Sequence, residues 1–312
     1  MTDDELRRMA SSGPAFSTLA SQGPIDWTEW RAAATSLKHD LAGAADLDRR
    51  IHHLYLPVLF FCAAQARSAE RPPVLIGLQA PQGAGKTTLV SHVLKLLPKL
   101  GLRGTGVSID DFYQTRDQQL ELAAKHPGNP YLEHRGYPGT HDVDLGVTTL
   151  SGLRELGDGH AGLAVRVPVY DKSKHGGRGD RTPMSDWREV TGPLDIVIVE
   201  GWMLGFTPVA EATLDDESLV EPNRELADYD RWIRLLDAFV VIRATDPRFV
   251  LEWRVQAEAA MAAQGRPALS RAAIEDYIRR FLPAYARYGG APKRFPADRQ
   301  LTIAIDRQRR AV

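Results

Sequence analysis

The stretch LIGLQAPQGAGKTT at residues 75–88 decides the fold. An apolar run leads into a glycine-rich turn, and the turn leads into residues suited to begin a helix. Glycines let backbone N–H groups turn toward a phosphate, and the positive end of the following helix favours negative charge. This order of strand, turn and helix is the context that a phosphate-binding loop requires. The sequence therefore predicts that the chain binds a nucleoside triphosphate.

The residues of this loop have separate expected roles. We expect Lys86 to reach the β- and γ-phosphate oxygens and Thr87 to offer its hydroxyl to Mg²⁺. Further nucleotide contacts are expected from Gly83, Ala84, Gly85 and Thr88. Ala80 stands where the eight-residue pattern has its first glycine, so this position must accommodate a Cβ atom.

Charge and cysteine content exclude several classes of function. The chain has 39 basic and 40 acidic residues in 312, so no overall field attracts nucleic acid or an anionic membrane, and we expect neither as a partner. The single cysteine, Cys62, lies in an apolar stretch, which excludes an internal disulfide and a cysteine-based metal cluster. Binding must therefore come from local sites, and Cys62 is expected to be a buried apolar residue. The sequence sets no oligomeric state.

The compartment is predicted from the same features. The first five residues are acidic where a secretory or mitochondrial leader would be basic, and the longest apolar run is short and interrupted by Pro57. We therefore expect a cytoplasmic protein.

Apolar runs predict a parallel sheet. Beyond residues 75–78, such runs occur at 106–109, 195–199, 238–242 and 301–305, and helical patterns separate them. Alternating strands and helices, notably the helical patterns at 86–97 and 247–263, indicate an α/β fold with a doubly wound parallel sheet. Ligands bind at the carboxyl ends of the strands in such sheets, so the residues after each strand are the candidates for chemistry.

The remaining segments suggest an organisation around this sheet. We expect residues 1–70 to form a helical N-terminal extension packed on the core and residues 71–312 to form one domain around the phosphate-binding loop. Residues 113–192 are rich in Gly, Pro, Asp, His and Arg, with a helical pattern only at 145–156, and are predicted to be an irregular substrate-binding segment. Residues 207–233, acidic and polar, are predicted to be a surface excursion.

Carboxylates follow two of the predicted strands. Asp110 and Asp111 come after the second strand, where a carboxylate facing the γ-phosphate can accept the proton of an attacking hydroxyl. Most Asp-Asp pairs cap turns, but a position at a strand end in a phosphate-binding fold favours catalysis. Glu200 follows the strand at 195–199 and, together with Thr87, is a candidate Mg²⁺ site.

Two glycine-containing loops carry candidate substrate contacts, at residues 135–142 and 168–181. A solvated loop is the ordinary explanation, but so many donors suited to phosphate or carboxylate favour substrate capture. His141 could be a metal ligand or a base, although a histidine held by a hydrogen bond beside Asp142 is the expected arrangement. The candidate substrate-binding residues are Asp111, Tyr113, Arg135, His141, Asp142, Tyr170, Lys172, Arg178 and Arg181.

Five sequence blocks together resemble a known family. They are APQGAGKTT at 80, SIDDFY at 108, RGYPGTHD at 135, PVYDKSKHGGRGDR at 168 and EGWMLGF at 200. The combination resembles the D-glycerate 3-kinase family and, more distantly, the group of uridine kinase, pantothenate kinase and phosphoribulokinase. The resemblance extends from residue 74 to about residue 290.

The resemblance implies a fold, a reaction and residue roles. The fold would be that of the P-loop nucleoside triphosphate hydrolases, with a helical N-terminal cap and a lid at about residues 247–290. Asp110 would be the base and Glu200 the metal-associated acid, with Lys86 also catalytic. Arg254, with Gln256, would belong to the lid that closes over the phosphates. The reaction would be ATP-dependent and Mg²⁺-dependent phosphorylation of a small hydroxy acid, from D-glycerate to 3-phosphoglycerate.

Two other functions fit the same residues. One is a kinase of this architecture for another metabolite alcohol, such as a nucleoside or a pantothenate-like compound. The other is a regulatory ATPase that transfers no phosphate to an acceptor. The chain has no Asn-Lys-x-Asp sequence for guanine recognition, which argues against a GTPase form of the second function.

Overall fold

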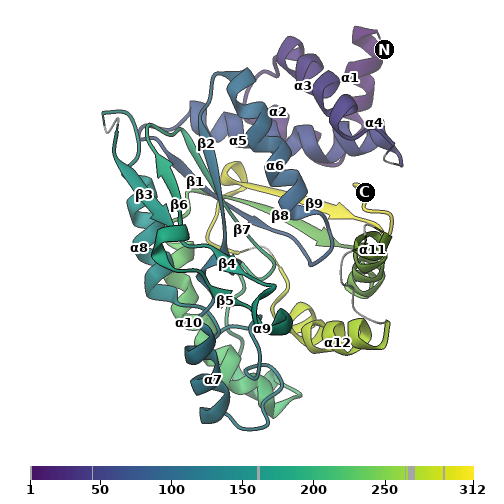
Figure 1. The fold of residues 1–312 in the computed structure, drawn as a ribbon. Helices are drawn as coiled ribbons and strands as arrows, with labels where there is room; N and C mark the ends of the chain where they lie inside the picture. Colours follow the sequence, from purple (N-terminus) through teal and green to yellow (C-terminus); the bar gives the residue numbers. More distant parts are fainter. Residues whose placement is uncertain (1, 44, 160–161, 264, 266–270, 291) are drawn as a thin grey trace.

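The computed structural model describes residues 2–43, 45–159, 162–263, 265, 271–290 and 292–312. Its centre is a five-stranded parallel sheet with strand order β2-β7-β1-β8-β9 (Figure 1). The strands are β1 (Val74–Gln79), β2 (Gly104–Ser108), β7 (Ile196–Gly201), β8 (Ala238–Ala244) and β9 (Gln300–Ile305). All five predicted strands are therefore confirmed, and the α/β doubly wound parallel sheet with them.

The sheet is covered on both faces, which explains the unbroken apolar runs in its sequence. Every residue of β1 and β7 is buried. Successive side chains of a strand point to opposite faces. Accordingly Val74 and Ile76 join one apolar core, whereas Leu75 between them joins the second. The sheet thus separates two cores, and the loops begin at the ends of its strands.

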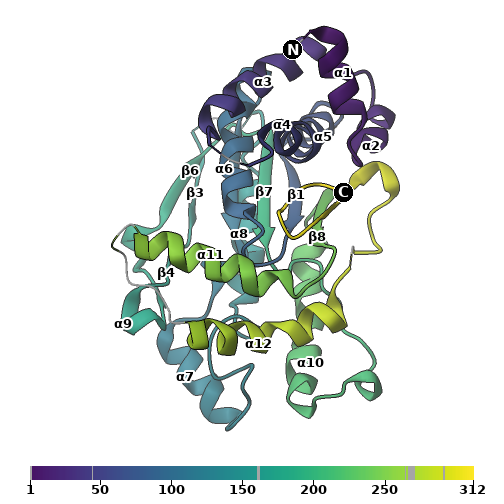
Figure 2. The ribbon, with the colours of Figure 1, turned by 90° about the vertical axis from the view of Figure 1, so that its right-hand side faces the viewer.

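The first core is covered by helices from the N-terminal half of the chain (Figures 1 and 2). These elements are α1 (Asp3–Ser11), α2 (Phe16–Ser21), α3 (Trp27–Asp40), α4 (Leu47–Arg50), the π-helical turn η1 (Ile51–Tyr55), α5 (Leu56–Arg67) and α6 (Lys86–Leu96). Cys62 is fully buried in this core, as predicted, and burial raises the pKa of its thiol to about 12.

The second core is covered by α8 (Val143–Arg154) and α10 (Val220–Ile233). The prediction that residues 207–233 form a surface excursion is wrong for the part that forms α10. Leu226, Tyr229 and Ile233 recur at helical spacing and are buried there, together with Trp232. The acidic residues of α10 occupy its other face and concealed this apolar stripe in the sequence.

The segment 113–192 is less irregular than its composition predicted. Besides α8, it contains α7 (Arg116–Lys125), β3 (Ala164–Val167), β4 (Tyr170–Asp171), α9 (Lys174–Gly177), β5 (Asp180–Arg181) and β6 (Arg188–Thr191). Strand β3 pairs with β6, and β4 pairs with β5, each antiparallel. Two-residue strands such as β4 and β5 are too short to produce a periodic signal in a sequence.

Two long helices lie beside one another near the phosphate-binding loop (Figure 2). They are α11 (Phe249–Ala263) and α12 (Arg271–Tyr288), and they occupy the range predicted for a lid. Residues 264 and 266–270 of that range lie outside the described residues. The short 3-10 helices are Leu97–Leu100, Ile109–Phe112, Met184–Asp186, Glu211–Thr213, Glu217–Leu219 and Ala297–Arg299. Across the described ranges, no helix has the length and apolar character needed to cross a membrane.

A neutral histidine links α3 to the π-helical turn. His52 is fully buried, and its Nδ1 accepts a hydrogen bond of 3.0 Å from Trp30 Nε1. Burial lowers the pKa of His52 from 6.5 to about 4. Because the unfolded chain takes up this proton more readily than the folded chain, folding becomes less favourable as the pH falls from about 6.5 toward about 4.

We therefore expect His52→Gln to flatten the acid side of the stability profile. The free energy of unfolding of the parent should fall by roughly 3 kcal/mol more than that of the variant across this window. Urea unfolding at a series of pH values measures the difference, and His39→Gln, at an exposed histidine, is the matched control. Parallel profiles for the parent and His52→Gln would show that His52 is not the titrating group.

Candidate active site

The loop between β1 and α6 is a preformed anion site. Gly83 and Gly85 adopt left-handed φ values of +77° and +90°, which favour glycine. A Cβ atom on Gly83 would also lie 2.7 Å from Cβ of Trp253 on α11. No side chain caps the N-terminus of α6 after Gly85, so its first N–H groups are left for a ligand. Ala80 is fully buried and belongs to the first apolar core, so its Cβ atom is accommodated among apolar side chains.

Glu200 at the end of β7 lies beside the start of α6. Thr87 Oγ1 donates a hydrogen bond of 3.1 Å to Glu200 Oε1, and Lys86 Nζ lies 3.9 Å from Glu200 Oε2. The Glu200 side chain is 7% exposed, its Oε2 atom has no hydrogen-bond partner, and burial raises the pKa of its carboxyl. A buried carboxylate oxygen without a partner, next to a hydroxyl, has the donor chemistry that a hard divalent cation requires.

Within the part of the chain that the structure describes, no three metal-ligating side chains are grouped together.

Asp110 lies at the end of the neighbouring strand β2. Its carboxylate oxygen is 2.5 Å from Nζ of Lys172, which follows β4 in the substrate segment. Burial opposes ionisation of Asp110, but the charges of Lys172 and Lys86 outweigh it and lower the pKa of this carboxyl to about 2. Asp110 is therefore an ionised carboxylate that interacts with both lysines of the site.

Asp111 has different neighbours. Burial raises the pKa of Asp111 to about 6, against the backbone groups of Tyr170 and Ser108 that lower it. Its charge acts on Arg188 of β6, whereas Asp110 acts on Glu200. The pKa of Asp111 would suit a base better, but the structure gathers Asp110 with the phosphate-binding loop, and position takes precedence over pKa.

A cluster of aromatic side chains lies near Asp110. The rings of Tyr113 and His141 stack at 4.3 Å, and Tyr170 packs edge-on against Tyr113 at 5.3 Å. His141 Nδ1 lies 2.8 Å from the hydroxyl of Tyr229, and burial lowers the pKa of His141 to about 3 despite the charge of Asp110. His141 is thus a neutral, hydrogen-bonded histidine, the arrangement that the sequence favoured over a metal ligand or a base.

Two further predicted residues hold the substrate segment together. Arg181 forms an ion pair of 3.2 Å with Asp142 and donates a hydrogen bond of 2.8 Å to the carbonyl of Tyr113. Asp142 also accepts a hydrogen bond from the N–H of Leu145 at the start of α8. These contacts fix the two loops relative to each other.

The remaining cations are spread around the rim. The guanidinium of Arg135 lies 5.5 Å over the ring of Tyr170 and donates to the carbonyl of Gly177 at 3.0 Å. Arg178 is exposed, and its guanidinium contacts His134 rather than Asp110 or the phosphate-binding loop. The structure therefore brings Lys172 to the centre of the site and leaves Arg178 at its edge.

Arg254 extends from α11 toward the same region. It forms an ion pair with Glu258 and lies 5.4 Å over the ring of Tyr277 on α12. The charges of Arg254, Asp110 and Lys172 act on the hydroxyl of the partly buried Tyr277, so this tyrosine lies close to both Arg254 and the site. Tyr277 carried no signal in the sequence, because a tyrosine in a helical pattern is ordinarily a core residue.

Two other residues in contact with the loop were also missed. The hydroxyl of Tyr285 accepts a hydrogen bond of 3.0 Å from the N–H of Gln82, and Arg309 Nε donates one of 2.8 Å to the carbonyl of Gly83. Arg309 follows β9, so the rule that ligands gather at strand ends could have identified it.

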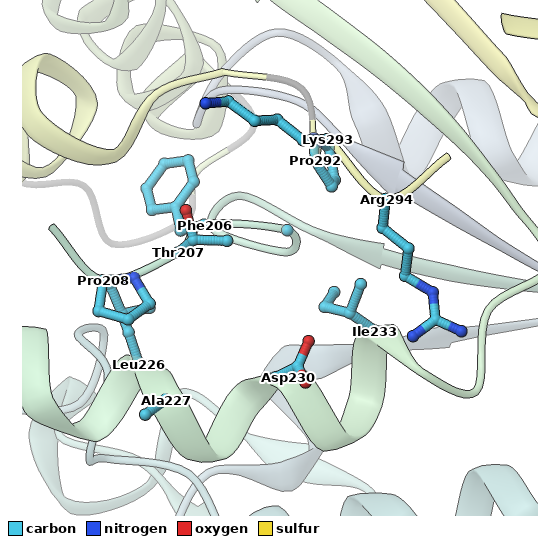
Figure 3. Close-up of a pocket in the computed structure, with 11 residues that line it drawn as sticks. Phe206, Thr207, Pro208, Leu226, Ala227, Asp230, Ile233, Pro292, Lys293 and Arg294 are labelled. Atoms are coloured by element: carbon cyan, nitrogen blue, oxygen red, sulfur yellow. The ribbon is translucent and has the colours of Figure 1, made fainter. Parts of the chain in front are cut away.

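Of two pockets in the structure, one is lined by the phosphate-binding loop and the other is not. The larger, about 320 Å³, is formed by residues 205–208, α10 and residues 292–294, and contains none of the predicted site residues (Figure 3). A second pocket of about 220 Å³ is lined in part by Gly83, Ala84, Gly85 and Thr88. The predicted site thus adjoins the smaller pocket.

Two eukaryotic kinases are similar to this chain in sequence. A chloroplastic D-glycerate 3-kinase of Arabidopsis thaliana is 41% identical over 280 residues, which cover 84% of this chain and 61% of the plant protein. This chain therefore spans less than two thirds of that relative. An uncharacterized kinase of Schizosaccharomyces pombe is 35% identical over 245 residues, which cover 75% of this chain and 87% of that protein. No protein-family model matches the chain.

A solved structure extends the likeness to three dimensions. The D-glycerate 3-kinase from Cryptococcus neoformans var. grubii superposes with a TM-score of 0.76 at 30% identity, covering 83% of this chain and 97% of that one. The P-loop fold expected from the sequence is confirmed by this match. With its fold, its phosphate-binding loop and nearly the whole of a solved relative in common, the chain belongs to the D-glycerate 3-kinase family.

Proposed function

We propose that the chain transfers the γ-phosphoryl group of ATP to the primary hydroxyl of D-glycerate and forms 3-phosphoglycerate and ADP. The observation that carries this proposal is that three features lie together at the carboxyl ends of the parallel strands. These are the uncapped start of α6 with Lys86, the Thr87 and Glu200 pair, and the Asp110 and Lys172 pair. The names of the plant and fungal relatives support D-glycerate as the acceptor.

The phosphate-binding loop holds the donor. The N–H groups at the start of α6 and the ammonium of Lys86 bind the phosphate oxygens and draw charge from the leaving ADP. Thr87 and the unpartnered oxygen of Glu200 would hold Mg²⁺, whose charge neutralises the β- and γ-phosphates when it is bound.

Asp110 and Lys172 act on the acceptor. Asp110 takes the proton of the glycerate hydroxyl as the oxygen attacks the γ-phosphorus and the bond to the β-phosphate oxygen breaks. Lys172 pairs with Asp110 in the free protein, and its side chain is 57% exposed. We propose that the glycerate carboxylate draws Lys172 away, which raises the pKa of Asp110 and makes it a better base.

Two parts of the chain have proposed supporting roles. Helices α11 and α12 form a lid in which Arg254 reaches the phosphates, as supported by the packing of Trp253 on Gly83. Residues 1–70 form an extension that packs on the domain of residues 71–312. We also propose a cytoplasmic location, since the sequence has one cysteine and no disulfide.

Product analysis tests the function itself. The purified chain is incubated with ATP, Mg²⁺ and a panel of hydroxy acids, nucleosides and pantothenate, and phosphorylated products are identified by mass spectrometry and ³¹P NMR. We expect phosphate on the primary hydroxyl of D-glycerate, and no phosphate release without an acceptor. Turnover restricted to a nucleoside, or free phosphate as the only product, would contradict the proposal.

Glu200→Gln should weaken the response to Mg²⁺. The change is isosteric, keeps an oxygen for the Thr87 hydroxyl, and removes the charge that would meet the cation. We expect the Mg²⁺ concentration for half-maximal activity to rise by about tenfold or more. Glu252→Gln, at an exposed glutamate, is the control. Overlaid Mg²⁺ titrations of Glu200→Gln and the parent would assign the metal elsewhere.

Asp110→Asn should lower kcat by about 10² to 10⁴-fold with little change in ATP affinity, because it removes a positioned base. Asp111→Asn is the matched variant and should cost much less, since Asp111 lies toward Arg188. Steady-state kinetics with ATP and D-glycerate give both values. A larger loss in Asp111→Asn would reverse the assignment.

Lys172 and Arg178 are the two candidate contacts to the acceptor carboxylate, and variants of each distinguish between them. Because Lys172 lies at the candidate base and Arg178 at the rim, Lys172→Met should raise the KM for D-glycerate by about tenfold or more, and Arg178→Ala by less. The KM for ATP should change little in both. If Arg178→Ala has the larger effect on D-glycerate, the substrate loop must close further than the structure shows.

A further inference from the structure

The larger pocket lies outside the site assigned to the proposed reaction. Residues 205–208, which follow β7, form one side of it, and α10 forms another. Residues 292–294, between α12 and β9, face α10 across the pocket (Figure 3). The volume of about 320 Å³ falls within the roughly 300–1,000 Å³ that pockets for small-molecule ligands occupy. The pocket is therefore large enough for a separate ligand.

The interior of this pocket is apolar. Phe206, Leu226 and Ile233 line it and are buried, and Pro208 and Pro292 add further apolar surface. An aliphatic or aromatic group placed here would remove apolar area of both partners from water, which favours binding. The walls thus suit a ligand with an apolar body.

The rim of the pocket is positively charged. Lys293 and Arg294 are exposed there. Among the described residues, the Lys293 ammonium has no hydrogen bond or ion pair, and the one hydrogen bond of Arg294 goes to the carbonyl of Arg234, at 3.5 Å. Asp230 also lines the pocket, but its carboxylate is already paired with Arg234 at 2.5 Å. Two adjacent cations over an apolar interior suit a ligand that ends in an anionic group.

Close packing joins two of the segments that form the pocket. Gly205 has a left-handed φ of +86°, and a Cβ atom on it would lie 2.6 Å from Cγ of Pro292. The chain after β7 and the chain after α12 therefore touch at a glycine, with no side chain between them. A ligand bound to both segments would hold them together.

Aromatic contacts connect these segments to the active site. The ring of Phe206 lies 5.7 Å from that of Trp202, in the turn after β7, and 6.1 Å from that of Tyr288 on α12. Trp202 packs edge-on against Tyr285 at 5.3 Å, and the Tyr285 hydroxyl accepts the hydrogen bond of the Gln82 N–H. The pocket is thus connected by direct packing to the phosphate-binding loop.

We propose that this pocket is an effector site for a small amphipathic anion. The apolar body of the ligand lies against Phe206, Leu226 and Ile233, and its carboxylate or phosphate pairs with Lys293 and Arg294. By holding the chain after β7 against the chain after α12, the ligand stabilises the arrangement in which the phosphate-binding loop is already formed, and ATP binds more tightly. The inference goes beyond the proposed function and requires only that the chain binds ATP.

Isothermal titration calorimetry of the intact chain with octanoate tests the chemistry of the site. Octanamide, which has the same apolar body and no charge, is the matched ligand. Octanoate should bind with one-to-one stoichiometry. Lys293→Met together with Arg294→Met should weaken octanoate binding by about tenfold and change octanamide binding by less than about twofold. Arg8→Met together with Lys125→Met removes two exposed cations elsewhere and should bind octanoate as the parent does.

Ala227→Trp tests the location of the site. Ala227 lines the pocket from an exposed position of α10, so an indole there fills the pocket without entering the core. This variant should lose binding of both ligands, whereas Ala32→Trp, at an exposed position of α3, should keep it, with thermal unfolding as the check on folding. The site is overturned if the parent does not bind octanoate, if binding survives Ala227→Trp, or if removing both rim cations leaves it unchanged.

The effect on the active site is measured with ATP. Saturating octanoate should tighten ATP binding by about fivefold or more, and saturating ATP should tighten octanoate binding by the same factor. Tyr285→Phe keeps the ring against Trp202 and removes the hydroxyl that contacts Gln82, so it should still bind octanoate and lose this mutual effect. ATP binding that octanoate leaves unchanged or weakens would overturn the effector role. An ATP affinity that responds to octanoate in a chain that does not phosphorylate D-glycerate would contradict the proposed function alone.

Discussion

The site depends on two carboxyl groups at the carboxyl ends of the parallel strands, the ionised Asp110 and the buried Glu200. Asp110 and Glu200 lie at the ends of neighbouring strands, where two negative charges would repel each other and lose hydration. Lys86 beside Glu200 and Lys172 beside Asp110 offset this cost. The carboxylates and the lysines therefore stabilise one another, and we propose that each of these lysines also binds an incoming anion.

The fold supplies this group through rigid elements. The sheet is packed on both faces, so β2 and β7 cannot shift independently, and α6 begins directly after the loop that it shares with β1. The lack of a side chain on Gly83 lets α11 pack on the loop through Trp253. By contrast, Lys172 lies on a short hairpin with two-residue strands and is half exposed, so the movable member of the cluster comes from its least rigid element.

The strands of the sheet and the phosphate-binding loop could be predicted from the sequence. The strands were visible because a buried parallel strand is apolar throughout, and the loop was visible because phosphate binding requires glycine and lysine at fixed spacing. Helix α10 was missed because its acidic face concealed Leu226, Tyr229 and Ile233. The separation of Asp110 from Asp111 and the position of Arg309 depend on long-range packing, which adjacent residues in a sequence do not encode.

The central claim is that Lys172 keeps the pKa of Asp110 low until the acceptor arrives. Carboxyl ¹³C NMR of protein labelled at aspartate, with Asp110 assigned by the missing resonance of Asp110→Asn, measures this directly. In the free protein the Asp110 resonance should remain that of a carboxylate down to about pH 4, and saturating D-glycerate, like Lys172→Met, should raise the pKa. If neither D-glycerate nor Lys172→Met changes the pKa of Asp110, the account is contradicted. Lys172 would then neither lower the pKa of Asp110 nor respond to the substrate.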